Sequence, residues 1–87
     1  MPESMFHPLA SISPLPGYKL RAKFKTGEER LYDAGTLEKI WPEFGDLRAI
    51  PGLFELVHLD AGGHGVVWND YLDLSSEEIW YEGIPMP

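Results

Sequence analysis

The pattern between Tyr18 and Lys25 constrains the fold more than any other part of the chain. Four apolar side chains alternate with four basic ones without interruption: Tyr18, Lys19, Leu20, Arg21, Ala22, Lys23, Phe24 and Lys25. A period of two places the two kinds of side chain on opposite faces of a β-strand. Thr26–Gly27 is a turn signal, and residues 28–33 can return as the antiparallel partner. The pattern predicts a hairpin with one apolar face and with Glu28, Glu29 and Asp33 near the basic row.

Shorter elements are expected on both sides of this hairpin. Residues 9–13 alternate loosely before two prolines, which favours a short edge strand. Residues 34–41 have helical spacing, with Thr36 as a possible N-cap and Pro42 as the stop. Residues 46–50 can form a further helical turn before the Pro51–Gly52 turn.

The segment from residue 54 to residue 82 predicts a second hairpin and a terminal helix. A strand over 54–59, with Phe54 and Leu56 buried, runs into a glycine-rich turn and returns over 65–68. Asn69–Asp70 can form a tight turn ahead of a short strand over 71–74. Ser75 and Glu78 have the spacing of a capping box, which predicts that a helix starts there.

These elements predict one α+β domain over residues 8–82. The sheet is expected to be mostly antiparallel, with four or five short strands and two short helices. A chain of 87 residues, 44% of them hydrophobic, has enough apolar side chains for one modest core and no room for a second. Residues 1–7 and 83–87 lack periodicity and are expected to be flexible termini.

Composition bounds the environment and the class of partner. The chain has no cysteine, which fits a reducing compartment, and no apolar run approaches the ~20 residues of a membrane helix. Its opening residues do not resemble a signal peptide, so we expect a cytoplasmic protein with no membrane association. The net charge is −7, which repels nucleic acid unless a local patch overrides it.

The order of these elements resembles a small bacterial family known as domain of unknown function 2442. The matching stretches run from about residue 9 to residue 82: YKLRAKFKTGEERLYD, LRAIPGLFELVHLD and VVWNDYLDLSSEEIWYEG. Trp68 and Asp73–Leu74 match the family's tryptophan and its acidic mark before the last helix. Asn69 departs from the family's usual proline, and Glu29 stands where an aliphatic residue is usual.

The resemblance implies a compact α+β fold with an antiparallel sheet and supplies no activity. Members resemble stand-alone partners of other small proteins, in some cases in arrangements similar to toxin–antitoxin pairs, or are fused to helix-turn-helix domains.

Two sets of residues are candidates for chemistry. His58, Asp60 and His64 surround the glycine-rich turn, and imidazole with carboxylate suits zinc or another transition metal, as in a metal-dependent hydrolase. Carboxylates also crowd the chain from Asp70 to Glu78. Helix capping and turn formation explain most of them, and no nucleophile or phosphate-binding motif is present. We therefore expect a protein that is not an enzyme and needs no cofactor.

Two surfaces are candidates for binding. Trp68, Tyr71 and Trp80 would form an aromatic patch for a protein partner if their rings are exposed. The basic face formed by Lys19, Arg21, Lys23 and Lys25 could contact nucleic acid or an acidic partner, although paired carboxylates explain it equally well.

The preferred hypothesis is a non-enzymatic protein–protein interaction module, whose partner would be a small toxin-like or nucleic-acid-acting protein of basic charge. A nucleic-acid-binding regulator and a metal-dependent activity at His58, Asp60 and His64 are the alternatives.

Overall fold

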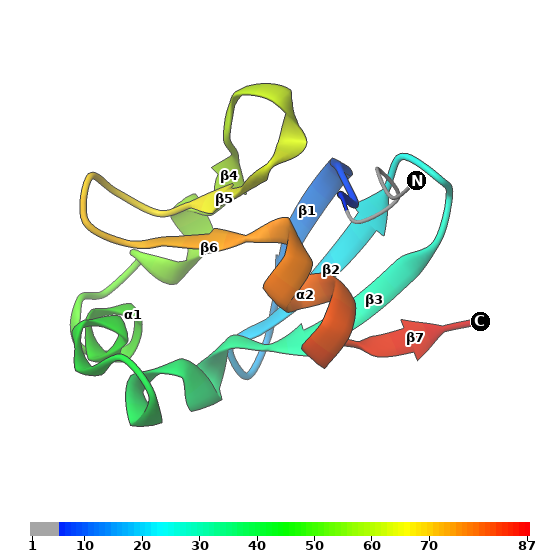
Figure 1. The fold of residues 1–87 in the computed structure, drawn as a ribbon. Helices are drawn as coiled ribbons and strands as arrows, with labels where there is room; N and C mark the ends of the chain where they lie inside the picture. The colour runs from blue at the N-terminus through cyan, green and yellow to red at the C-terminus, as the bar shows by residue number, and fades with distance from the viewer. Residues whose placement is uncertain (1–5) are drawn as a thin grey trace.

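A computed structural model describes residues 6–87, which form two small antiparallel sheets and several short helices (Figure 1). One sheet has the order β1-β2-β3-β7 and the other the order β4-β5-β6. The strands are β1 (Leu9–Leu15), β2 (Lys19–Phe24), β3 (Glu29–Asp33), β4 (His58–Leu59), β5 (Gly65–Val67), β6 (Asp73–Ser75) and β7 (Ile84–Met86). The helices are α1 (Asp46–Ala49), α2 (Ser76–Glu82) and the 3₁₀ helices η2 (Ala34–Lys39), η3 (Pro42–Gly45), η4 (Phe54–Leu56) and η5 (Ala61–Gly63). The predicted α+β class is confirmed.

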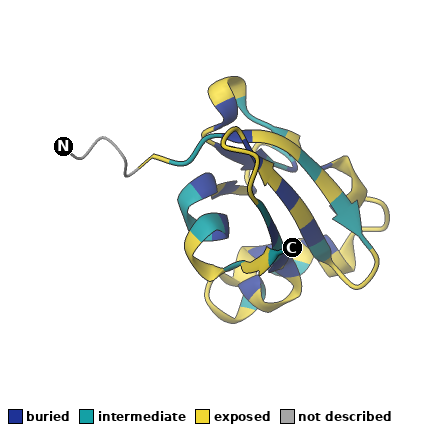
Figure 2. Cartoon of the chain, turned by 90° about the vertical axis from the view of Figure 1, so that its right-hand side faces the viewer, coloured by how far each residue is buried: buried dark blue, intermediate teal, exposed yellow. Residues whose placement is uncertain are grey.

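The period-two pattern of the first hairpin is confirmed. Leu20, Ala22 and Phe24 are buried, while Arg21 and Lys23 on the same strand are exposed. Buried and exposed residues alternate along the strands of this sheet (Figure 2). β1 is an edge strand, as expected, but it extends through Pro14, which pairs with Leu20.

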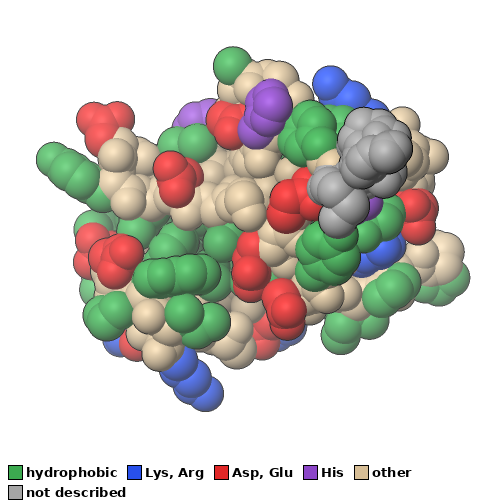
Figure 3. Space-filling view, in the orientation of Figure 1, with side chains coloured by type: hydrophobic (Ala, Val, Ile, Leu, Met, Phe, Trp, Pro, Cys, Tyr) green, Lys and Arg blue, Asp and Glu red, His purple; other side chains and the backbone are tan. Residues whose placement is uncertain are grey.

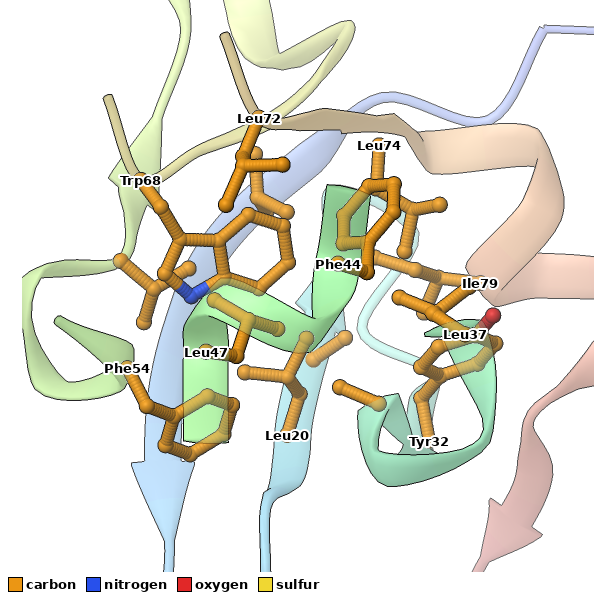
Figure 4. Close-up of a cluster of buried hydrophobic side chains, with 14 of the residues drawn as sticks. Leu20, Tyr32, Leu37, Phe44, Leu47, Phe54, Trp68, Leu72, Leu74 and Ile79 are labelled. Atoms are coloured by element: carbon orange, nitrogen blue, oxygen red, sulfur yellow. The ribbon is translucent and has the colours of Figure 1, made fainter. Parts of the chain in front are cut away.

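The core lies between the larger sheet, α2 and the short helices that connect the sheets (Figure 4). Its side chains come from segments far apart in the sequence, among them Leu20, Leu37, Leu47, Trp68, Leu72 and Ile79. The rings of Phe44 and Trp68 meet edge to face with their centroids 5.8 Å apart. Aromatic pairs of this kind add about 0.5–1.5 kcal/mol beyond the burial of their area.

The C-terminal helix begins where the capping pattern predicts. The side-chain oxygen of Ser75 accepts a hydrogen bond of 3.1 Å from the backbone N–H of Glu78. The other half of the capping box is absent among residues 6–87, because the Glu78 carboxylate accepts a hydrogen bond from Tyr32 instead.

Two predicted elements differ from the structure. Residues 34–39 form the 3₁₀ helix η2, and its N-cap is Asp33 rather than Thr36, because the Asp33 side chain accepts a hydrogen bond from the backbone N–H of Gly35. The strand expected over residues 54–59 is only His58–Leu59, preceded by η4. Leu53, Phe54 and Val57 share one side of this helical turn and are buried, which leaves Leu56 62% exposed.

Both chain ends were expected to be flexible, and the described part of each one contacts the rest of the domain. Ile84–Met86 form β7 and pair with β3, so the larger sheet includes residues beyond position 82, where the domain was expected to end. At the other end, the backbone N–H of His7 donates to Glu77 Oε2 at 2.6 Å, and the His7 ring stacks on Trp80 with centroids 3.9 Å apart. Residues 1–5 lie outside the described part of the chain.

Candidate functional site

A groove of about 320 Å³ lies between η3 and β6. In Figure 1, β6 and the segment that holds η3 lie one above the other on the same side of the molecule. Three aromatic and three acidic residues line most of the groove: Trp41, Phe44, Tyr71, Glu43, Asp73 and Glu78. Asp and Glu side chains are interspersed with hydrophobic ones over this face (Figure 3). We call this site the acidic aromatic groove.

Local sequence explains why two of these aromatic rings are exposed. Trp41 precedes Pro42, which disfavours helical backbone at residue 41 and holds it extended (φ −127°, ψ 100°). The Asn69 side chain accepts hydrogen bonds from the backbone N–H groups of Tyr71 and Leu72 at 2.8 and 2.9 Å. This turn buries Leu72 in the core and leaves Tyr71 88% exposed.

The carboxylates of the groove come from three different elements. Glu43 lies in η3, Asp73 is an exposed residue of β6, and Glu78 lies in the first turn of α2. The Glu78 carboxylate is held in place by a hydrogen bond, because the hydroxyl of the buried Tyr32 donates to its Oε2 atom at 3.0 Å. Among residues 6–87 no lysine or arginine lines the groove. Its charge is therefore purely negative.

Burial, followed by the nearby Glu78 carboxylate, raises the pKa of Tyr32 well above its ordinary value of 10. The neutral phenol is thus the form that the folded state favours. A group whose pKa is higher in the folded than in the unfolded state contributes stability that is fully present below the unfolded pKa. That contribution is lost as the pH rises from 10 toward the folded pKa.

We expect Tyr32→Phe to lower the free energy of unfolding by about 1.5 kcal/mol at pH 7, because it removes a hydrogen bond to a carboxylate. The difference between the two proteins should shrink above pH 10, where the unfolded wild-type tyrosine ionises. Urea unfolding across that range measures it. As a control, folded wild type and Tyr32→Phe should have equal tyrosinate absorbance at pH 10. A larger absorbance in the wild type would show that Tyr32 ionises normally.

The predicted aromatic patch is only partly brought together. Tyr71 lines the groove, but Trp68 is 2% exposed and belongs to the core. Trp80 is partly buried, and its ring contacts His7, Arg30 and Phe24. Trp68 and Trp80 are therefore not part of an exposed patch with Tyr71.

Sequence reasoning missed Trp41, which takes the place expected of Trp68. Trp41 is the last residue of the segment 34–41 that was predicted to be helical, and its ring is 41% exposed. The signal that could have found it is the Trp41–Pro42 step, because a residue before proline tends to leave the helix. Glu43 was also missed, because it lies in η3, the segment that follows Trp41 and was not predicted to hold a site.

The basic face is present, and carboxylates from β3 accompany it as predicted. Arg21 Nε donates to Glu29 Oε1 at 2.7 Å, and Lys19 Nζ lies 3.8 Å from Asp33 Oδ2. The hydrogen bond to Arg21 lowers the pKa of Glu29 below its usual value. Lys23 and Lys25 are exposed on the same side of the hairpin. Two of the four basic groups are thus offset by acids.

The structure does not bring the predicted metal ligands together. His58 Nδ1 lies 3.0 Å from the backbone oxygen of Leu56, and Asp60 Oδ1 accepts a hydrogen bond of 2.7 Å from the backbone N–H of His64. The His64 ring stacks on Phe6 with the ring centroids 4.5 Å apart. Within the described range 6–87, no three His, Asp or Glu side chains are arranged to hold a metal ion.

Comparison with known proteins gives one match. The model of a family described as "Protein of unknown function (DUF2442)" matches residues 9–85, which is nearly the whole chain. No curated protein and no solved structure is significantly similar to this chain. Over the part of the chain that is described, no helix is both long and apolar enough to cross a membrane.

Proposed function

The chain belongs to the DUF2442 family, and we propose that it is a non-enzymatic protein-interaction module that holds a basic segment of a partner protein in the acidic aromatic groove. The observation that carries this proposal is the position of Trp41 and Tyr71, two exposed aromatic rings beside three carboxylates.

Exposed aromatic rings leave apolar surface in water that a bound partner can cover. Tryptophan and tyrosine are enriched among the residues that dominate binding energy at protein interfaces. A ring that is 88% exposed, as Tyr71 is, contributes little to the core, whereas a bound partner would cover its apolar surface. Both rings line the same groove, so one partner segment can contact the two of them.

Charge selects the class of partner. Glu43, Asp73 and Glu78 face the groove, and the chain has a net charge of −7, so a basic segment is attracted both at the site and at a distance. We propose a small toxin-like or nucleic-acid-acting protein as the partner, because proteins that bind nucleic acid contact its phosphates through lysine and arginine. We place the encounter in the cytoplasm, which suits a chain without cysteine.

The two alternatives have weaker support. The basic face would have to release Arg21 from Glu29 before it could bind a phosphate backbone, and it would do so against the negative charge of the chain. A metal-dependent activity would require His58, Asp60 and His64 to rearrange. We therefore propose neither.

Site-specific photo-crosslinking tests the proposal. We expect Tyr71→p-benzoylphenylalanine, expressed in the source organism, to form an adduct with a basic protein that mass spectrometry identifies. Tyr71 is 88% exposed, so the change leaves the core intact.

Leu56→p-benzoylphenylalanine is the matched control, because Leu56 is 62% exposed and does not line the groove. An adduct at position 71 alone supports the proposal. The same adduct in equal yield at both positions, or an acidic partner at position 71, would contradict it.

A further inference from the structure

Building on this proposed function, we infer that the acidic aromatic groove is an arginine-recognition site, which takes the guanidinium group of the partner segment in preference to a lysine ammonium group. The carboxylates of Glu43, Asp73 and Glu78 would accept its N–H groups, and the Trp41 ring would provide a surface for its planar face.

The first support is the combination of flat rings with carboxylates. A guanidinium group is planar, carries five N–H donors and stacks on aromatic rings, whereas an ammonium group is a compact and strongly hydrated point charge. A carboxylate can accept two parallel hydrogen bonds from one guanidinium group. A lysine would satisfy the charge of this groove but would leave much of the ring surface uncovered.

The second support is the way Glu78 is held. Tyr32 already donates to Glu78 Oε2, which fixes the orientation of this carboxylate and engages one of its oxygens. Because Tyr32 is 4% exposed, it is held in place by the core. A carboxylate that is oriented before binding loses less entropy when it pairs with a ligand. Directional hydrogen bonding of this kind favours the fork of a guanidinium group.

The third support is a pairing of the same kind inside this chain. The guanidinium carbon of Arg30 lies 4.1 Å from the centroid of the Trp80 ring. Arg30 Nε donates to the backbone oxygen of Trp80 at 3.3 Å, and Arg30 Nη1 lies 3.7 Å from Glu28 Oε2. Ring, carboxylate and guanidinium thus meet at Trp80, Glu28 and Arg30. The groove presents rings and carboxylates without the guanidinium.

The size of the groove agrees with a side chain as the bound group. A volume of about 320 Å³ is at the lower end of the range for small-molecule sites, which is roughly 300–1,000 Å³. One arginine side chain and the backbone next to it can fill this hollow, but an entire helix cannot enter it.

Titration with single-residue probes, followed by NMR, tests the inference. The probes are the acetylated methylamides of arginine, lysine and citrulline, and citrulline matches arginine in shape but carries no charge. The reporter is the indole N–H resonance of Trp41, which is identified by its loss in Trp41→Phe. We expect the arginine probe to bind about tenfold more tightly than the citrulline probe. We expect it to bind about threefold to tenfold more tightly than the lysine probe, a difference of about 0.7–1.4 kcal/mol in binding free energy.

Two isosteric variants locate the binding. Asp73→Asn should weaken arginine binding by about fivefold to tenfold, while Asp70→Asn should leave it unchanged, because Asp70 is an exposed acid that does not line the groove. Equal loss in both variants would show that only the overall charge matters, and it would overturn the inference.

The outcomes separate this inference from the proposed function. If the arginine and lysine probes bind equally and the citrulline probe does not bind, arginine selectivity is overturned, but the groove stays a site for basic segments. Equal binding of arginine and citrulline, or no binding of any probe, would also overturn the inference. In either case the crosslink at position 71 still decides the proposed function independently.

Discussion

Gly63→Ala is expected to lower the free energy of unfolding by about 3 kcal/mol, because residue 63 has no room for a side chain. Gly63 has φ +73°, a left-handed conformation that costs an alanine about 1–2 kcal/mol. A Cβ atom at this position would also overlap the backbone carbonyl oxygen of Leu9 in β1. Backbone atoms cannot move aside as a flexible side chain can, so the turn and β1 would have to separate.

Gly27→Ala isolates the conformational part of this effect, so the difference between the two variants gives the steric part. Gly27 has φ +97° in the first hairpin turn, and an added Cβ would meet no atom within 4 Å. This variant should lose only the conformational cost of about 1–2 kcal/mol. Urea unfolding followed by circular dichroism measures both variants. Equal losses would show that the contact between the η5 turn and β1, where the smaller sheet meets the larger one, does not constrain the fold.

Trp80→Ala is expected to cost about 3 kcal/mol, close to the lower limit for a buried aromatic ring replaced by alanine. The ring contacts Phe24 edge to face at 4.8 Å, stacks on His7 and lies under the Arg30 guanidinium group. Its removal takes the aromatic surface from Arg30, whose side chain is only 10% exposed and would lose that interaction while still buried.

Trp41→Ala provides the matched comparison for Trp80→Ala. Trp41 is 41% exposed in the groove, and we expect its loss to change the free energy of unfolding by only about 1 kcal/mol. Chemical denaturation of both variants separates a structural tryptophan from one that is available to a ligand. Similar losses in the two variants would contradict this division. A double-mutant cycle that combines Trp80→Ala with Arg30→Met should give a coupling free energy of about 1 kcal/mol between the two side chains.

Local patterns in the sequence predict the elements of this fold that depend on local chemistry. The alternation in β2 determines which residues face the core, and the spacing of Ser75 and Glu78 places the start of α2 correctly. The proximity of Glu29 to Arg21 follows from the pairing of two short strands. Each of these features is decided by residues that are near each other in the chain or in one hairpin.

The features that were not predicted depend on packing between distant segments. Trp68 is buried because Phe44 and Phe54, which lie earlier in the chain, pack against it, and no local pattern encodes that contact. Arg30 is buried because its strand position turns it toward Trp80, fifty residues later. Conversely, Trp41 has an apolar pattern around it and is nevertheless exposed.

The candidate site was harder to predict than the fold for the same reason. Its residues come from two segments, 41–44 and 71–78, which are about thirty positions apart in the sequence and meet only in the folded chain. The net charge of −7 favoured a basic partner as a hypothesis, but it did not identify the groove. Tyr71 was the one residue of the predicted aromatic patch that lies there.

The crosslink at position 71 in a chain with a neutralised groove tests the central claim most directly. Glu43→Gln and Asp73→Asn remove two charges and keep the shape of the groove, and Glu78 stays in place on Tyr32. We predict that p-benzoylphenylalanine at position 71 captures a basic protein in the parent chain and that this adduct is lost in the neutralised chain. An undiminished adduct with the same protein would contradict recognition of a basic segment by the acidic aromatic groove.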